Sequence, residues 1–192
     1  MTVTPYVTAP DAIACPPWVR LGTVLVTQTP LGDTLCGLAH LTYAQALEVA
    51  TAYGARLPTR AEVYALHLAA SEAGTELEPF VLPTPTQRAT GSRPGDPAMV
   101  SFEWAATHDA AVVSQVRRLL SAAPQALVAN AGKHWIGGAS RGMARICGWW
   151  TERVESYGSS RHGHGFVQEG VIDVHGDAHF DYATTTILAR DA

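Results

Sequence analysis

In residues 41–66 the chain reads LTYAQALEVATAYGARLPTRAEVYAL, a stretch that contains two helix starts in close succession. Thr42 followed by Gln45 forms a capping box, in which the threonine hydroxyl and the glutamine side chain satisfy backbone amides of the first helical turn. Thr59 followed by Glu62 forms a second one of the same kind. The stretch therefore predicts two consecutive helices joined by a short link.

The ends of these helices and the position of a third are also indicated. We expect the first helix to stop at Gly54 and the second near Gly74, because glycine adopts the left-handed conformation that closes a helix. A third helix is expected over Asp109–Leu120, with Pro124 just beyond it. Residues 79–97 carry five prolines and predict a long surface loop between the second and third helices. The buried face of the third helix is expected to consist of Val112, Val116, Leu119 and Leu120.

Strand patterns flank the helical half, residues 42–120. Residues 21–27 are rich in β-branched side chains and predict one strand, and Phe180–Ala189 alternates with the period of two that is typical of another. Residues 126–192 are rich in Gly, Trp and His and predict short strands with long loops. Because strand patterns lie near both ends, the sequence predicts a single domain, residues 1–192, with a sheet closed by its own termini.

Composition narrows the classes of partner. The chain has 192 residues, with 13 basic against 17 acidic ones, and its formal charge of −4 argues against the basic stripe of a nucleic-acid-binding protein. No run approaches the roughly 18 apolar residues of a membrane-spanning helix, so no membrane partner is expected. No secretory signal is recognised near residue 1. We therefore expect synthesis in the cytoplasm, and leave open a later release to the cell wall or association with a virion.

The cysteines predict reduced thiols. Cys15, Cys36 and Cys147 are an odd and widely spaced set without a CxxC pair. Such a set is not typical of a disulfide framework or of a cysteine-based zinc site.

The link between the two expected helices resembles a known family. Arg56-Leu57-Pro58-Thr59 followed by Glu62 is similar to the helical signature of the formylglycine-generating-enzyme family, and residues 187–190 resemble the family's final strand. The resemblance implies an α+β, C-type-lectin-like fold with two or three helices and a small antiparallel sheet with long loops. The family's oxidation chemistry uses two cysteines close together, whereas Cys147 stands alone in the last third. The resemblance therefore does not imply formylglycine synthesis.

The last third resembles a second family. Gly132-Lys133, Gly148-Trp149 and the segment His175–Tyr182, which reads HGDAHFDY, are similar to the GK, GW and HGxxxxDY elements of an uncharacterised family of phage and bacterial proteins. Ala183 stands where that family often has serine, and Trp150 where it often has histidine. The resemblance implies a phage or bacterial setting.

Candidate catalytic residues lie in the same third. Lys133 is the chain's single lysine, and His175, Asp181 and Tyr182 follow it in the HGxxxxDY segment. An aspartate that orients a histidine, with an ammonium and a hydroxyl nearby, is typical of acid–base catalysis. A buried His175–Asp181 pair that only pins the last strand is the structural alternative.

A zinc site is a second hypothesis for the same region. His162 and His164 are two residues apart and share a face if the segment is extended, and His175 or His179 would supply a third ligand with a position left for water. Residues 160–165 also resemble the SxHxxG stretch of zinc D-Ala-D-Ala carboxypeptidases. Glu169 stands where that family has an aspartate ligand, and the interval to His179 is much shorter. A solvated turn carrying two exposed imidazoles is the alternative, and Zn²⁺ therefore stays an open cofactor.

Ligand contacts are expected from aromatic and acidic residues. Trp135 and Trp149 are candidates for a sugar platform, with packing in the core as the alternative for both. Glu169, with Glu152, is the candidate for a carboxylate pair of the kind that cleaves glycosidic bonds.

Two function classes follow from these residues. The first is a phage-type or bacterial cell-wall-active hydrolase, endolysin-like, whose substrate is peptidoglycan or another glycan or peptide. The second is a non-catalytic C-type-lectin-like binding module, or a structural or receptor-recognition protein of a virion, because fold alone does not imply activity.

Overall fold

The structure is a computed structural model that describes residues 12–33, 38–75, 102–128, 133–137, 142–147, 166–169 and 184–192. Of these, residues 33, 102–109, 133, 142–147, 166–169 and 184 are described by their backbone. The proline-rich segment 79–97 lies outside the described residues, and the loop expected there stays a prediction.

The first predicted helix is confirmed as α1, Tyr43–Ala52. The hydroxyl of Thr42 accepts a hydrogen bond from the Gln45 amide at 3.2 Å, and the Gln45 side chain accepts one from the Thr42 amide at 2.9 Å. Gly54 follows the helix with a φ of 58°, in the left-handed region where a side chain would be strained.

The second predicted helix is confirmed as α2, Arg60–Ala73. Thr59 and Glu62 form the second capping box, with hydrogen bonds of 3.3 Å and 2.7 Å. Gly74 is the left-handed C-cap, as expected.

The third helix, α3, spans Phe102–Ala122 and begins seven residues before the expected Asp109. Aspartate favours the first turn of a helix, but this preference does not require the helix to begin there. On the expected buried face, Val112 is buried, whereas Val116, Leu119 and Leu120 are half-buried.

The N-terminal region forms two strand pairs in place of one long strand. The four strands are β1, Ile13–Ala14; β2, Trp18–Leu21; β3, Val24–Thr27; and β4, Gly32–Asp33. The strand predicted over residues 21–27 is confirmed at Val24–Thr27, but the chain turns at Gly22, whose φ is 61°, and Leu21 belongs to the preceding strand and pairs with Val24 across the turn. Glycine is the residue that adopts this conformation without strain, so the turn divides the β-branched run into a hairpin.

The C-terminal region contains two short strands, β8, Thr184–Thr185, and β9, Ala189–Asp191. The strand predicted over Phe180–Ala189 is confirmed in part, at Thr184–Thr185 and at Ala189, but residues 186–188 are not strand and residues 185–189 are all buried without alternation. Both sides of residues 185–189 are covered, so their burial does not follow a period of two. Residues 180–183 lie outside the described residues. The prediction that the two end regions share a sheet is confirmed, since β9 pairs with β3 in the order β2-β3-β9.

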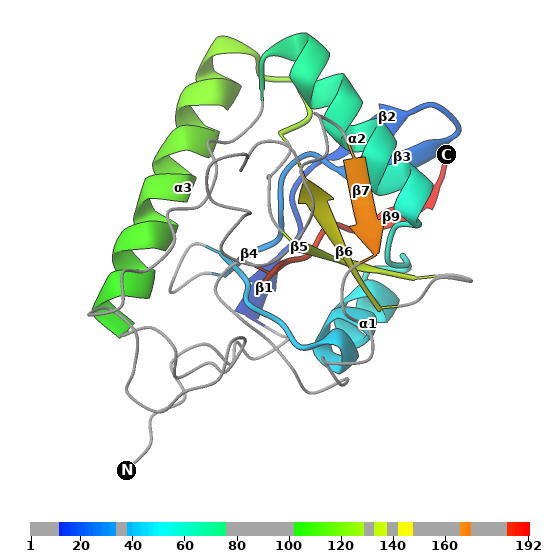
Figure 1. Cartoon of the computed structure of the whole chain (residues 1–192), viewed down its shortest axis with the longest axis horizontal. Coiled ribbons are helices and arrows are strands. Elements are labelled where there is room, and N and C mark those ends of the chain that lie inside the picture. Colours follow the sequence, from blue (N-terminus) through cyan, green and yellow to red (C-terminus); the bar gives the residue numbers. More distant parts are fainter. Residues whose placement is uncertain are drawn as a thin grey trace.

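A second sheet follows the helices and has the order β7-β6-β5-β8. It contains β5, Lys133–Ile136; β6, Gly142–Cys147; and β7, Phe166–Glu169. Neighbouring strands are antiparallel, except that β5 and β8 are parallel. Three helices with small, mainly antiparallel sheets in the described ranges make this an α+β fold (Figure 1).

Two hydrophobic clusters meet at the C-terminal segment. Leu188 packs in the cluster that contains α1 residues, such as Val49, and its neighbour Ile187 packs in the cluster that contains Leu66 of α2. The segment is held on one side by the N-terminal hairpin, where the Thr27 amide donates to the Leu188 carbonyl at 3.0 Å. Residues 185–189 therefore run through the interior between the two helices.

The link between α1 and α2 holds the other side of this segment. Arg56 and Ala189 exchange backbone hydrogen bonds of 2.9 Å and 2.8 Å. The Arg56 guanidinium also makes a bidentate ion pair with Glu62, with nitrogen–oxygen distances of 2.8 Å and 2.7 Å. The hydrogen bonds from Arg56 hold the pKa of Glu62 below its usual value, against the opposing effect of burial.

The same link fixes the end of β5. Gly137 donates its amide to the Pro58 carbonyl at 3.0 Å. A Cβ at Gly137 would lie 3.3 Å from Leu57 Cβ, which is a tight contact, so this close approach favours glycine.

We expect Glu62→Ala to lower the free energy of unfolding by about 2 kcal/mol, because it removes the side-chain half of the α2 capping box and leaves Arg56 without its strongest partner. Glu72→Ala, on the exposed end of the same helix, is the matched control and should change stability by less than about 0.5 kcal/mol. Urea denaturation of both variants measures the difference through the midpoint at constant slope. Equal midpoints for the two variants would contradict the role of the ion pair.

Candidate functional site

The second sheet brings several strand ends to one of its edges. Lys133, the first residue of β5, is in register with Thr184, the first residue of the parallel strand β8. Because β6 is antiparallel to both β5 and β7, the last residue of β6, Cys147, and the first residue of β7, Phe166, lie at the same end of the sheet. We call this end, defined by Lys133, Cys147, Phe166 and Thr184, the strand-start edge.

The predicted catalytic and ligand-binding residues are only partly within the described ranges. Lys133 is the first residue of β5 and pairs with Arg145 of β6. Glu169 ends β7 and pairs with Ala144, which puts its backbone one row along the sheet from Lys133. The remaining predicted residues lie outside the described residues: Trp149, His162, His164, His175, His179, Asp181 and Tyr182.

Trp135 belongs to the core and not to a ligand platform. Its exposed fraction is 1%, and its indole N–H donates to the Leu41 carbonyl at 2.8 Å. Its ring packs edge-on against Tyr43, with centroids 5.4 Å apart. A tryptophan this deeply buried offers no face to a sugar, so the packing alternative describes Trp135 and the ligand-binding prediction for it is corrected.

A buried histidine pair lies directly beside the predicted lysine. His134 follows Lys133 on β5, and its Nε2 lies 3.2 Å from Nε2 of His67 on α2. Its Nδ1 lies 3.2 Å from the Thr185 hydroxyl on β8. Both imidazoles are fully buried, so they form a polar connection between α2, β5 and β8 inside the core.

This geometry requires at least one of the two rings to be neutral, and burial favours the neutral form of His67. Two Nε2 atoms at hydrogen-bond distance need one hydrogen between them, so one ring donates and the other accepts. If His67 donates, His134 carries its hydrogen on Nδ1 and donates to Thr185; if His134 donates, Nδ1 accepts from the threonine hydroxyl. Burial holds the pKa of His67 well below its usual value, and His134 lowers it further.

No local pattern of residues indicates this pair. His67 is expected from its position in the helical half to be structural, and its full burial confirms that expectation. His134 looked like one of the polar residues of the last third. Its partner is 67 residues away in the chain, a separation at which spacing carries no information.

The zinc hypothesis is not tested by the described residues. Within those ranges, no three side chains of the His, Cys, Asp or Glu type come together as metal ligands. The predicted ligands His162, His164 and His179 lie outside them. Of the cysteines, the described Cys15 is a free thiol, in agreement with the expectation for that residue.

Comparison with protein families, curated proteins and solved structures gave no match for this chain. None of the helices in the described part of the chain is long and apolar enough to cross a membrane. The case for a function therefore depends on the residues and on the sheet that carries them.

The His67–His134 pair predicts a loss of stability in mild acid. Because the folded-state pKa of His67 is depressed, the unfolded chain binds a proton that the folded chain rejects. The stabilisation is therefore complete above the unfolded pKa of about 6.5 and falls by about 1.4 kcal/mol per pH unit below it, until the folded pKa is reached. Urea denaturation at pH 7.5, 6.5 and 5.5 measures this slope.

The control is His67→Gln, which keeps a hydrogen-bonding side chain but cannot take up the proton. This variant should be less stable than the wild type at pH 7.5. Its free energy of unfolding should also change less with pH, because one fewer proton is taken up on unfolding. Parallel slopes for the two proteins would show that His67 is not the group responsible.

Proposed function

We propose that the chain has a C-type-lectin-like fold of the formylglycine-generating-enzyme type. Support comes from the pairing of the N-terminal hairpin with the C-terminal strand, β3 with β9, and from two capped helices, α1 and α2, between them. A second sheet made by later strands, with long connecting segments, agrees with this arrangement. The Arg56–Glu62 pair gives the Arg-Leu-Pro-Thr motif a structural purpose in such a fold.

We further propose that the chain is a cell-wall-active hydrolase, endolysin-like, with its site at the strand-start edge. The observation that supports this is the register of β5 with β8, which starts both strands at the same level. Lys133 begins β5, and Asp181 and Tyr182 come just before Thr184 in the chain. Because consecutive Cα atoms are only about 3.8 Å apart, these two residues stay within a short reach of the edge that carries Lys133.

The chemistry proposed for this edge is hydrolysis by general acid–base catalysis. His175, oriented by Asp181, would take a proton from water as the water attacks the substrate, and would then give that proton to the leaving group as the original bond breaks. The Lys133 ammonium would stabilise the negative charge that develops on the oxygen of the attacked group, and the Tyr182 hydroxyl would donate a hydrogen bond to it. A lysine offers a compact and titratable charge that arginine does not reproduce.

The test is clearing of a peptidoglycan suspension by the purified full chain. Lys133→Arg, His175→Ala and Asp181→Ala should each slow clearing by about a hundredfold or more, because each removes a group that acts in the proposed transition state. Their thermal unfolding should match that of the wild type. Glu72→Gln, on the exposed end of α2, is the control that should keep full activity. If the Lys133→Arg variant still clears the suspension, Lys133 has no catalytic role, and its being the single lysine reflects only the composition of the chain.

The binding module is the second candidate. The burial of Trp135 removes one predicted ligand contact from both candidates, so it does not separate them. Sedimentation of the chain with insoluble peptidoglycan separates the two. Binding without clearing would support the binding module. The absence of both binding and clearing would reject both proposals.

Elemental analysis of the same preparation decides whether zinc takes part. One equivalent of zinc that is lost in His162→Ala and His164→Ala would assign the metal to those residues. Activity in a preparation free of metal would assign the acid–base arrangement without it.

A further inference from the structure

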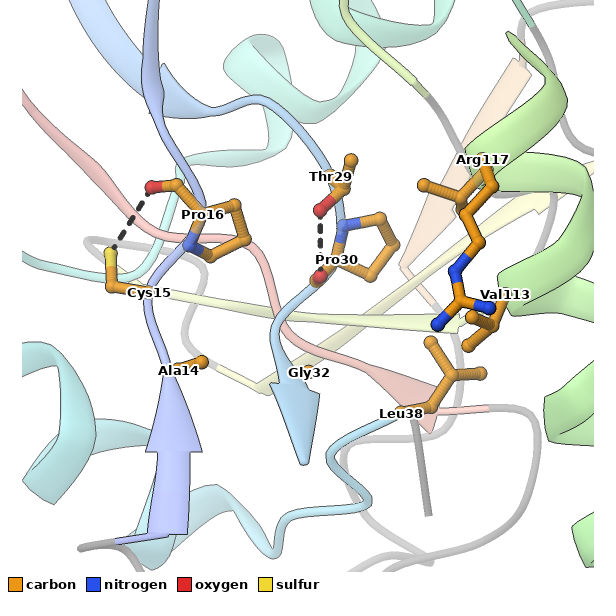
Figure 2. Close-up of a pocket in the computed structure, with 10 residues that line it drawn as sticks. Ala14, Cys15, Pro16, Thr29, Pro30, Gly32, Leu38, Val113 and Arg117 are labelled. Atoms are coloured by element: carbon orange, nitrogen blue, oxygen red, sulfur yellow. Dashed lines mark hydrogen bonds between the residues drawn. The ribbon is translucent and has the colours of Figure 1, made fainter. Parts of the chain in front are cut away.

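A pocket lies on the side of the fold formed by the N-terminal strands and α3. Its volume is about 250 Å³, and its walls come from four separate parts of the chain: residues 14–16, residues 29–32, Leu38 and α3. Figure 2 shows Cys15 and Pro16 at one end and the side chain of Arg117 at the other, with Pro30 between them. None of the residues proposed for catalysis lines it.

We propose that this pocket binds a small monoanion with a compact apolar body, of the size of a short-chain or aromatic carboxylate. The pocket would be a second site, independent of the hydrolase proposed for the strand-start edge.

The walls of the pocket are apolar and poor in hydrogen-bond donors. Pro16 and Pro30 have no backbone N–H, and the hydroxyl of Thr29 already donates to the Pro30 carbonyl at 3.1 Å. Leu38 and the α3 residue Val113 add aliphatic surface. Such walls favour a hydrocarbon body over a polar one, because a polar ligand would lose hydrogen bonds to water without replacing them.

The charge of the pocket is carried by Arg117. Its guanidinium is directed towards Leu38 and Val113 at one end of the pocket (Figure 2). Among the described residues, the ion pairs join Arg56 to Glu62 and to Asp191, and neither involves Arg117. A guanidinium can accept a carboxylate through two parallel hydrogen bonds, which gives an anion a preferred orientation.

The residues that line the opposite end of the pocket, Ala14, Cys15 and Pro16, carry no formal charge. The Cys15 thiol is half-buried, and its Sγ lies 3.5 Å from the Pro16 carbonyl. Burial raises the pKa of this thiol, against the opposing effect of Arg190, so the thiol is neutral near pH 7. A ligand with one anionic end and one apolar end therefore matches the two ends of the pocket.

The volume limits the size of the ligand. An apolar cavity of about 150 Å³ is large enough for benzene, and ligand pockets for drug-sized molecules begin at about 300 Å³. A pocket of about 250 Å³ therefore fits a single ring or a short chain together with a carboxylate.

The experiment uses phenylacetate as the probe and titrates it into the full-length chain, followed by protein-observed NMR. Saturable shifts are expected, and Arg117→Gln should weaken the affinity by roughly tenfold, the loss expected for one hydrogen-bonded charge pair. Arg118→Gln is the matched control, because Arg118 is the next residue of the same exposed helix and does not line the pocket. It should leave the affinity unchanged.

A second variant tests the apolar wall. Val113→Phe fills the pocket and should abolish the binding of phenylacetate, even though Arg117 is still present. Absence of saturable binding to the wild type would overturn the proposal. So would equal losses in Arg117→Gln and Arg118→Gln, since these would indicate attraction to the general charge of the helix. Each outcome is independent of peptidoglycan clearing, so failure of the pocket and failure of the hydrolase are distinguishable.

Discussion

The structure depends on the position of Arg56, which joins three parts of the chain. Its backbone pairs with Ala189 in an isolated antiparallel bridge, so the link between α1 and α2 is hydrogen-bonded directly to the C-terminal segment. Its guanidinium reaches forward to Glu62, which also caps α2. One residue therefore sets both the start of the second helix and the position of the segment that separates the two hydrophobic clusters. The bidentate geometry explains why arginine suits this position better than lysine.

The C-terminal segment shows why a period-two sequence pattern does not reveal burial on both sides of a segment. Residues 185–189 contact the N-terminal hairpin, the Arg56 link and both hydrophobic clusters, and all five are buried. A period of two arises only when one face of a strand meets water. The alternation expected there failed because the segment has no such face. β-branched threonines fit this position, but their hydroxyls need partners in the core, as the contact of Thr185 with His134 illustrates.

Local signals predicted much of the helical part, and long-range contacts account for what was missed. The capping boxes at Thr42 and Thr59 are complete within three residues, so their hydrogen bonds follow from the sequence alone. Trp135 and His134 lie next to Lys133 in a polar-looking stretch, and nothing nearby shows that both enter the core. Their partners, Leu41 and His67, are 94 and 67 residues away. Of the predicted site residues, Trp135 belongs to the core, Lys133 and Glu169 lie on β5 and β7, and the others lie outside the described residues.

The histidine pair connects the core to the proposed site. His134 and Thr185 each follow directly after one of the two residues that define the start of β5 and β8, Lys133 and Thr184. The contact with His67 ties both strands to α2, so the position of the strand-start edge depends on the His67–His134 pair. A proton on His67 would place a charge in the core, where burial disfavours the charged form of the ring. The proposed chemistry at this edge is therefore coupled to the protonation of His67. The coupling runs through His134 and Thr185, the residues that follow Lys133 and Thr184 in the chain.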